Sequence, residues 1–172
     1  VHDPLWAKAV VFADEQGAKA ALLAVDICML DRQNVAFMRE VIGAACDVPP
    51  DNVLIHATHT HSAPAASGKI GLEEEVAPHA AAIEAFLEKA ASAVAEADQA
   101  LADATLEVGH ATEDRLCFNR RLRRRDDTTQ MNWEALQPGF DPEQVVGAWG
   151  PVDPEMTCLT VRREGRPIAA LV

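Results

Sequence analysis

The sequence has 172 residues and a formal net charge of −12, from 27 Asp and Glu against 15 Lys and Arg. Such a negative surface repels phosphate backbones, so the composition disfavours general nucleic-acid binding. The four cysteines form no Cys-x-x-Cys pair, which argues against a zinc knuckle or a dense disulfide framework. No apolar run approaches the roughly 20 residues of a membrane-spanning helix, so we expect no transmembrane segment. The length favours a single domain.

The first third of the chain predicts two strands, a helix and a third strand. Lys8–Ala13 and Lys19–Ile27 are rich in Val and Leu, and the polar residues between them read as a hairpin turn. From Asp31 to Cys46 apolar residues recur at helical spacing, and Pro49-Pro50 prevents continuation of the helix. Val53–Ala57 is a short strand-like run that leads into a polar segment.

The remainder predicts a second helix, further strands and a long loop. Pro78–Ala104 has an apolar face at helical spacing, and Thr105–Gly109 reads as a strand. Residues from Glu113 to Gly150 show little periodicity and are predicted to be irregular. Met156–Arg162 and Pro167–Val172 form a candidate hairpin. The order ββαβαβ-loop-ββ predicts an α/β fold, with a mixed β-sheet and flanking helices.

Three histidines lie in the last part of the predicted strand Val53–Ala57 and directly after it. In an extended segment, residues two apart point the same way, so His59 and His61 can reach into one cleft while His56 faces away. A catalytic zinc ion takes three protein ligands, so these two imidazoles need a further ligand from elsewhere. The spacing alone leaves two interpretations open, a metal or catalytic site and a set of hydrogen-bonded packing residues.

Arginines are concentrated between Arg120 and Arg125 in an otherwise acidic chain. This run could recognise phosphate, carboxylate or RNA. Asp126 and Asp127 follow directly, however, so a solvated loop of ion pairs is the alternative interpretation, and the one we favour.

Two other residues are candidates for the same cleft as the histidines. Asp26 ends an apolar strand, where α/β proteins often place functional carboxylates, and it could orient a histidine from behind. An Asp at a strand end is equally common as a turn or cap residue. His2 lies in an entry turn, from which its ring could approach the cleft.

Taken together, the motifs resemble one family, the neutral/alkaline (non-lysosomal) ceramidases and their bacterial relatives. The resemblance rests on several segments in the same order, and the His-Thr-His-Ser-x-Pro motif is the most specific. The segments are His2–Leu5, Ala24–Asp26, Thr58–Pro64, Asn119-Arg120, Gly150–Glu155 and Gly165–Leu171. This resemblance implies that residues 1–172 are a partial N-terminal catalytic domain, truncated at both ends.

The resemblance also implies an activity and a set of site residues. In that family one zinc ion supports hydrolysis of the N-acyl amide of ceramide, to a fatty acid and a sphingoid base. His59 would be a zinc ligand, and His61 and Arg120 would be catalytic, with Asn119 in the same cleft. The remaining zinc ligands and a catalytic serine are expected beyond Val172, so residues 1–172 alone are expected to be inactive.

The sequence departs from the ceramidases at two places. It has Ala63 where they have Gly, and Arg121-Leu122 where they have Ser-Pro. We therefore expect a small-molecule or lipid N-acyl amide substrate, which need not be ceramide. Two alternatives stay open, a non-catalytic binding or structural module and a zinc hydrolase of esters or phosphates.

Overall fold

The computed structural model describes residues 3–63, 66 and 80–172. The chain divides into two compact units, residues 1–103 and 104–172, and each is described by itself. The prediction of a single domain therefore stays a prediction. No helix in the described part of the chain is long and apolar enough to cross a membrane.

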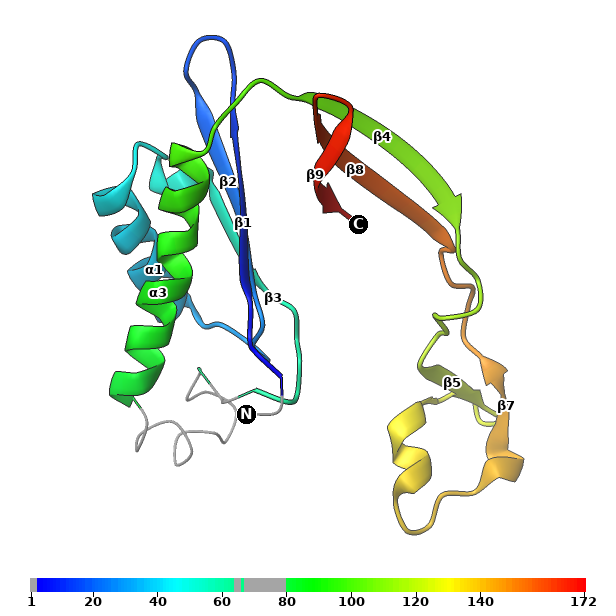
Figure 1. Ribbon diagram of the computed structural model, residues 1–172. Coiled ribbons are helices and arrows are strands. Elements are labelled where there is room, and N and C mark those ends of the chain that lie inside the picture. Colours follow the sequence, from blue (N-terminus) through cyan, green and yellow to red (C-terminus); the bar gives the residue numbers. More distant parts are fainter. Residues whose placement is uncertain (1–2, 64–65, 67–79) are drawn as a thin grey trace. The chain divides into compact units, whose positions relative to one another are not determined.

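The first unit contains a mixed three-stranded sheet, with strand order β1-β2-β3 (Figure 1). Strand β1 (Ala7–Ala13) pairs antiparallel with β2 (Lys19–Val25), and β2 pairs parallel with β3 (Val53–Ala57). The β1–β2 turn contains Gly17 with φ +85°, a backbone conformation that glycine adopts without steric cost. The mixed sheet confirms the predicted fold class.

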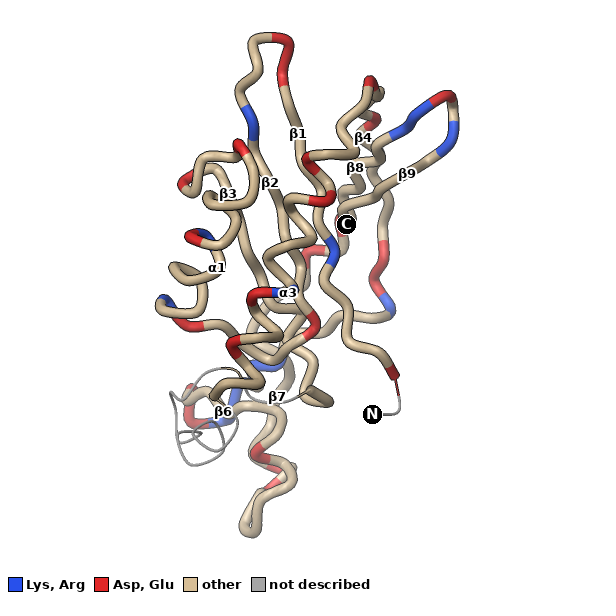
Figure 2. The backbone as a smooth tube through the Cα atoms, turned by 60° about the vertical axis from the view of Figure 1, so that its left-hand side comes forward, with Lys and Arg blue, Asp and Glu red and all other residues tan. Residues whose placement is uncertain are grey.

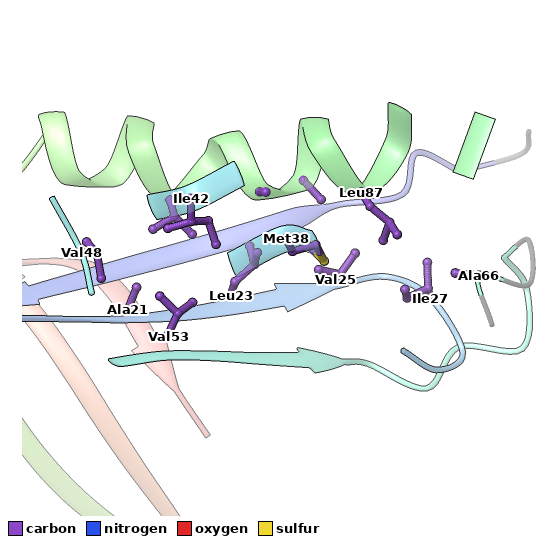
Figure 3. Close-up of a cluster of buried hydrophobic side chains, with 13 residues drawn as sticks. Ala21, Leu23, Val25, Ile27, Met38, Ile42, Val48, Val53, Ala66 and Leu87 are labelled. Atoms are coloured by element: carbon purple, nitrogen blue, oxygen red, sulfur yellow. The ribbon is translucent and has the colours of Figure 1, made fainter. Parts of the chain in front are cut away.

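Helices α1 (Arg32–Ala45) and α3 (Ala80–Gln99) cover one face of this sheet. Alternate residues of β2 point toward the helices because successive strand side chains face opposite sides, and these residues are buried. Burial of Leu23, which is 0% exposed, stabilises the fold by roughly 2 kcal/mol. Figure 3 shows the core between helices and strands, which comprises Ala21, Leu23, Val25, Ile27, Met38, Ile42, Val48, Val53, Ala66, Leu87, Ala90, Ala91 and Val94.

Helix α1 begins and ends where the sequence predicts. The carboxylate of Asp31 accepts hydrogen bonds from the backbone N–H groups of Gln33 and Asn34, at 2.8 and 2.9 Å. This N-cap satisfies donors that have no partner within the helix. The chain then passes through the short 3-10 turn η1 (Pro50–Asn52) into β3.

Helix α3 is shorter than predicted at its C-terminal end. It ends at Gln99, whereas apolar residues at helical spacing continue to Leu101, which is 38% exposed.

Near the C-terminal end of α3 the side chain of Lys19 pairs with that of Asp98 at 2.7 Å, and only 19% and 12% of the two side chains are exposed. The hydrogen bond to the Asp98 carboxylate raises the pKa of Lys19 above its ordinary value. This pair joins α3 to the start of β2.

The second unit contains an antiparallel sheet of order β4-β8-β9. It consists of β4 (Thr105–Thr112), β8 (Glu155–Arg163) and β9 (Arg166–Leu171). The turn between β8 and β9 has Glu164 and Gly165 at positive φ, which matches the right-handed twist of a hairpin. Charges of both signs mark this turn in Figure 2. The predicted hairpin is confirmed.

The prediction of an irregular segment over residues 113–150 is wrong. This segment holds a second antiparallel sheet of order β6-β5-β7, formed by β5 (Arg121–Arg124), β6 (Thr129–Met131) and β7 (Val145–Ala148). Two 3-10 turns, η3 (Asn132–Leu136) and η4 (Pro142–Gln144), connect β6 to β7. Strands of three or four residues, of which β5 is mostly arginine, carry too little apolar alternation to be recognised by periodicity.

Candidate metal centre

The carboxyl ends of β2 and β3 lie side by side, because the two strands are parallel and Val25 is in register with Ala57. The pairing continues past the strands. Thr58 donates its N–H to the carbonyl of Val25 at 3.0 Å, and His59 donates its N–H to the carbonyl of Ile27 at 3.1 Å. The backbone therefore holds His59 beside the segment that follows β2.

The ring of His59 is anchored on the backbone of that segment. Nδ1 lies 2.7 Å from the carbonyl oxygen of Cys28. A carbonyl only accepts hydrogen bonds, so in this arrangement Nδ1 carries the proton and Nε2 keeps its lone pair. Metal-ligating histidines commonly donate their other ring N–H in this way, which fixes the tautomer and the orientation of the ring.

His61 lies next to His59, as the sequence predicts, but for a different reason. The ring centroids are 5.0 Å apart and the ring planes are perpendicular. The segment is not extended, because β3 ends at Ala57 and His59 has φ +64°. A turn therefore brings the two rings together, whereas the prediction relied on the alternation of a strand.

His56 takes no part in this group. It lies within β3, its ring is exposed, and its Nδ1 is 3.3 Å from the carbonyl oxygen of its neighbour Ala57. This arrangement agrees with the prediction that His56 faces away from the other two histidines.

Cys28 completes a group of three candidate ligands that the sequence did not indicate. Among the residues that the structure describes, Cys28, His59 and His61 form the group of His, Cys, Asp or Glu side chains that could hold a metal ion, because their donor atoms lie within 4.8 Å of one another. Imidazole nitrogen and thiolate sulfur are donors that zinc accepts in proteins, so the donor set fits this ion. The available signal was the position of Cys28, three residues past β2 at the edge where β3 also ends.

Asp26 forms hydrogen bonds with the backbone of Trp6, the residue before β1. Its Oδ2 accepts the N–H of Trp6 at 3.0 Å, and its own N–H donates to the carbonyl of Trp6 at 2.9 Å. These bonds are those of a turn residue that fastens the start of β1 to the end of β2. A role in orienting His59 stays a prediction. His2 lies outside the described residues.

Asn119 and Arg120 belong to the second unit. The side chain of Asn119 accepts the N–H of Arg121 at 3.0 Å and donates to the carbonyl of Gly150 at 3.4 Å, so it ties the two ends of this segment together. The exposed guanidinium of Arg120 lies 5.9 Å from the ring centroid of Trp133. Because the two units are described separately, an approach of Arg120 to His59 stays a prediction.

Three other arginines of the cluster, Arg123, Arg124 and Arg125, have local partners, and Arg125 donates to the carbonyl of Glu143 at 2.8 Å. Arg123 pairs with Asp127 at 2.9 Å and lies 5.4 Å from the ring centroid of Trp149. Arg124 lies 3.7 Å from Asp126. Hydrogen bonds from the hydroxyl and backbone N–H of Thr128 lower the pKa of Asp126 below its ordinary value. These contacts agree with the interpretation of the cluster as a solvated loop of ion pairs, and exposed pairs of this kind contribute little to stability.

A shallow depression lies away from the histidines, at the C-terminal end of α1. Residues 46–50 line it, together with Arg39, Glu40 and Gly43. Arg39 donates to the carbonyl of Val53, the first residue of β3, at 2.8 Å. The depression therefore lies at the amino end of β3, whereas the histidines follow its carboxyl end.

Comparison with known proteins identifies similar chains. No protein-family model matches the sequence. A stretch of 76 residues, 42% of the chain, is 34% identical to neutral ceramidase A of Dictyostelium discoideum, of which it covers 10%. The crystal structure of neutral ceramidase from Pseudomonas aeruginosa is similar with a TM-score of 0.63 and 20% identity, over 99% of this chain and 26% of that one.

A solved structure of ceramidase complexed with C2 also has a TM-score of 0.63, with 21% identity over 99% of this chain and 25% of that one. At these identities the structural matches establish a shared fold. The chain therefore spans about a tenth of the curated relative and about a quarter of each solved ceramidase.

Proposed function

Because the chain resembles the neutral ceramidases in sequence and in fold, we propose that it is part of a zinc-dependent hydrolase of N-acyl amides. In this proposal the substrate is ceramide, which is split into a fatty acid and a sphingoid base, or a related N-acyl compound. The other zinc ligands and the catalytic serine lie beyond Val172. The activity belongs to the longer polypeptide, since residues 1–172 supply only part of the centre.

The observation that carries the proposal is the pairing of His59 and His61 at the carboxyl edge of a parallel strand pair, with centroids 5.0 Å apart. Ligand and active sites of α/β sheets gather at this edge. Both rings are exposed, so a substrate can reach them. The bond from Nδ1 of His59 to the carbonyl of Cys28 leaves Nε2 as the nitrogen available to a metal ion.

Each residue then has a role consistent with its chemistry. Bound zinc supplies Lewis acidity, which polarises a carbonyl group and lowers the pKa of water. His59 holds the ion, and its anchored ring keeps the ligand nitrogen in place. His61, next to it, exchanges a proton with the reacting groups, since a histidine can accept or donate a proton near neutral pH.

Arg120 is proposed to bind a polar or anionic group of the substrate. Its guanidinium presents several N–H donors, a geometry suited to carboxylate or phosphate. Asn119 bonds both the backbone of Arg121 and that of Gly150, which steadies the loop carrying Arg120. His2 and Asp26 are proposed to lie close to the same cleft.

A substrate panel tests this proposal on a polypeptide that continues past Val172. It contains an N-acyl sphingoid base, an ester of the same acyl chain and a phosphate monoester, each with and without a chelator. We expect chelator-sensitive cleavage of the amide. His59→Ala should abolish cleavage, and His61→Ala should lower kcat by about a hundredfold or more through loss of proton transfer.

His56→Ala is the matched control, because this exposed histidine of β3 lies outside the group and its replacement should leave full activity. If the protein cleaved the ester or the phosphate but not the amide, its substrate would belong to another class than the one proposed. No cleavage of any substrate by a folded, zinc-loaded protein would contradict an enzymatic role and favour a binding module.

A further inference from the structure

The thiol of Cys28 has no role in the proposed hydrolysis. Its Sγ lies 3.7 Å from Nδ1 of His59. The cysteine is half-buried and forms no disulfide. Its position is fixed by the backbone, because the N–H of His59 bonds the carbonyl of Ile27 and its ring bonds the carbonyl of Cys28 itself.

The separation of sulfur and nitrogen suits two ligands of one tetrahedral ion. Zinc lies about 2.3 Å from a thiolate sulfur and about 2.0 Å from an imidazole nitrogen, so two such ligands at a tetrahedral angle are about 3.5 Å apart. The observed 3.7 Å is close to this separation, although the Cys28 carbonyl, 2.7 Å from Nδ1, has to move aside for an ion to bind that nitrogen. His61 supplies the third donor, within 4.8 Å of the other two.

We propose that Cys28, His59 and His61 bind a thiophilic divalent cation, with Sγ of Cys28 and Nδ1 of His59 on the same ion. Thiolate and imidazole together select zinc and softer cations over magnesium and calcium. On binding, the thiol proton passes to water and the ring proton of His59 moves from Nδ1 to Nε2. One proton is released in all, and the bond from Nδ1 to the Cys28 carbonyl is given up.

Binding of a cation at this site regulates the hydrolytic centre. This regulatory role rests on the proposed function. The hydrolytic arrangement uses Nε2 of His59, whereas the thiolate arrangement uses Nδ1 and leaves a proton on Nε2. The two arrangements exclude each other. A cation softer than zinc, which favours the thiolate arrangement, therefore withdraws His59 from hydrolysis and inhibits the enzyme.

Titration with Co²⁺ tests the site without an activity assay, because a thiolate ligand on cobalt produces a charge-transfer band in the near ultraviolet. The wild-type chain should show this band. Cys28→Ser should lose it and bind Co²⁺ about tenfold more weakly or worse, with an unchanged circular dichroism spectrum. Cys117→Ser is the matched control, since Cys117 is an exposed free cysteine of the second unit, and it should keep the band.

A band that persists in Cys28→Ser would overturn the inference, and so would cobalt binding by the wild type without any band. Either result leaves the hydrolytic proposal standing if binding still requires His59. Failure of the substrate panel, in contrast, defeats the hydrolytic proposal and leaves the thiolate site in place.

Discussion

Three residues other than glycine have positive φ in the described part of the chain, His59, Asp127 and Glu164. Asp127 and Glu164 lie in the turns of two hairpins, where the turn type requires this conformation. His59 lies between a strand and a loop, where no hairpin requires it. Left-handed residues outside such turns cluster at functional sites, which supports the interpretation of His59 as a ligand held in a fixed orientation.

Glu164 offers a test of this conformational argument away from the site. An Asn-Gly pair is the preferred sequence of a turn with both central residues at positive φ, so Glu164→Asn should stabilise the β8–β9 hairpin by about 0.5–1 kcal/mol. Thermal denaturation measures the change. Asp114→Asn removes the same charge from an exposed residue and should leave the melting temperature unaltered. An equal gain in both variants would show that charge, and not backbone strain, is responsible.

The candidate metal ligands were only partly predictable from the sequence. His59 and His61 stand two apart in a recognisable motif, and the structure brings them together. Cys28 is 31 residues away along the chain, and only the parallel register of β2 and β3 places it beside His59. Lone cysteines carry no spacing pattern, so this contact requires the sheet topology.

At the scale of elements, the strands and helices with strong apolar periodicity were predicted well. Helix α1 has both an apolar face and a capping residue, and its bounds agree with the prediction. Strands β5, β6 and β7 were missed because strands of three or four residues provide too few alternating positions. Helix α3 was predicted too long, since apolar spacing continues past the last helical residue.

The cap of α1 provides a test at this scale. Asp31→Ala removes the acceptor of two backbone N–H groups and should destabilise the first unit by about 1 kcal/mol. Chemical denaturation followed by circular dichroism measures the loss. Glu40→Ala is the control, because Glu40 is an exposed acidic residue of the same helix and its replacement keeps the cap. A loss of the same size in both variants would contradict the role of the cap.

For the whole molecule, the buried apolar residues are concentrated in the first unit. Of the described core residues, Val161 alone comes from residues 104–172. The three candidate metal ligands also belong to the first unit, whereas Arg120 belongs to the second. The α/β class was predictable from the order of the predicted strands and helices, and the ceramidase resemblance from motifs that occur in order along nearly the whole chain. The arrangement of the two units carries no comparable signal in the sequence.

Metal binding by His59 is the property on which the proposed function most depends. Equilibrium dialysis against zinc, followed by metal analysis, measures it directly in a polypeptide that continues past Val172, as the wild type and as the His59→Ala and His56→Ala variants. We expect zinc bound in equal amounts by the wild type and His56→Ala, and none above background in His59→Ala with its fold intact. Equal zinc in all three proteins, or none in the wild type, would contradict the assignment of this centre.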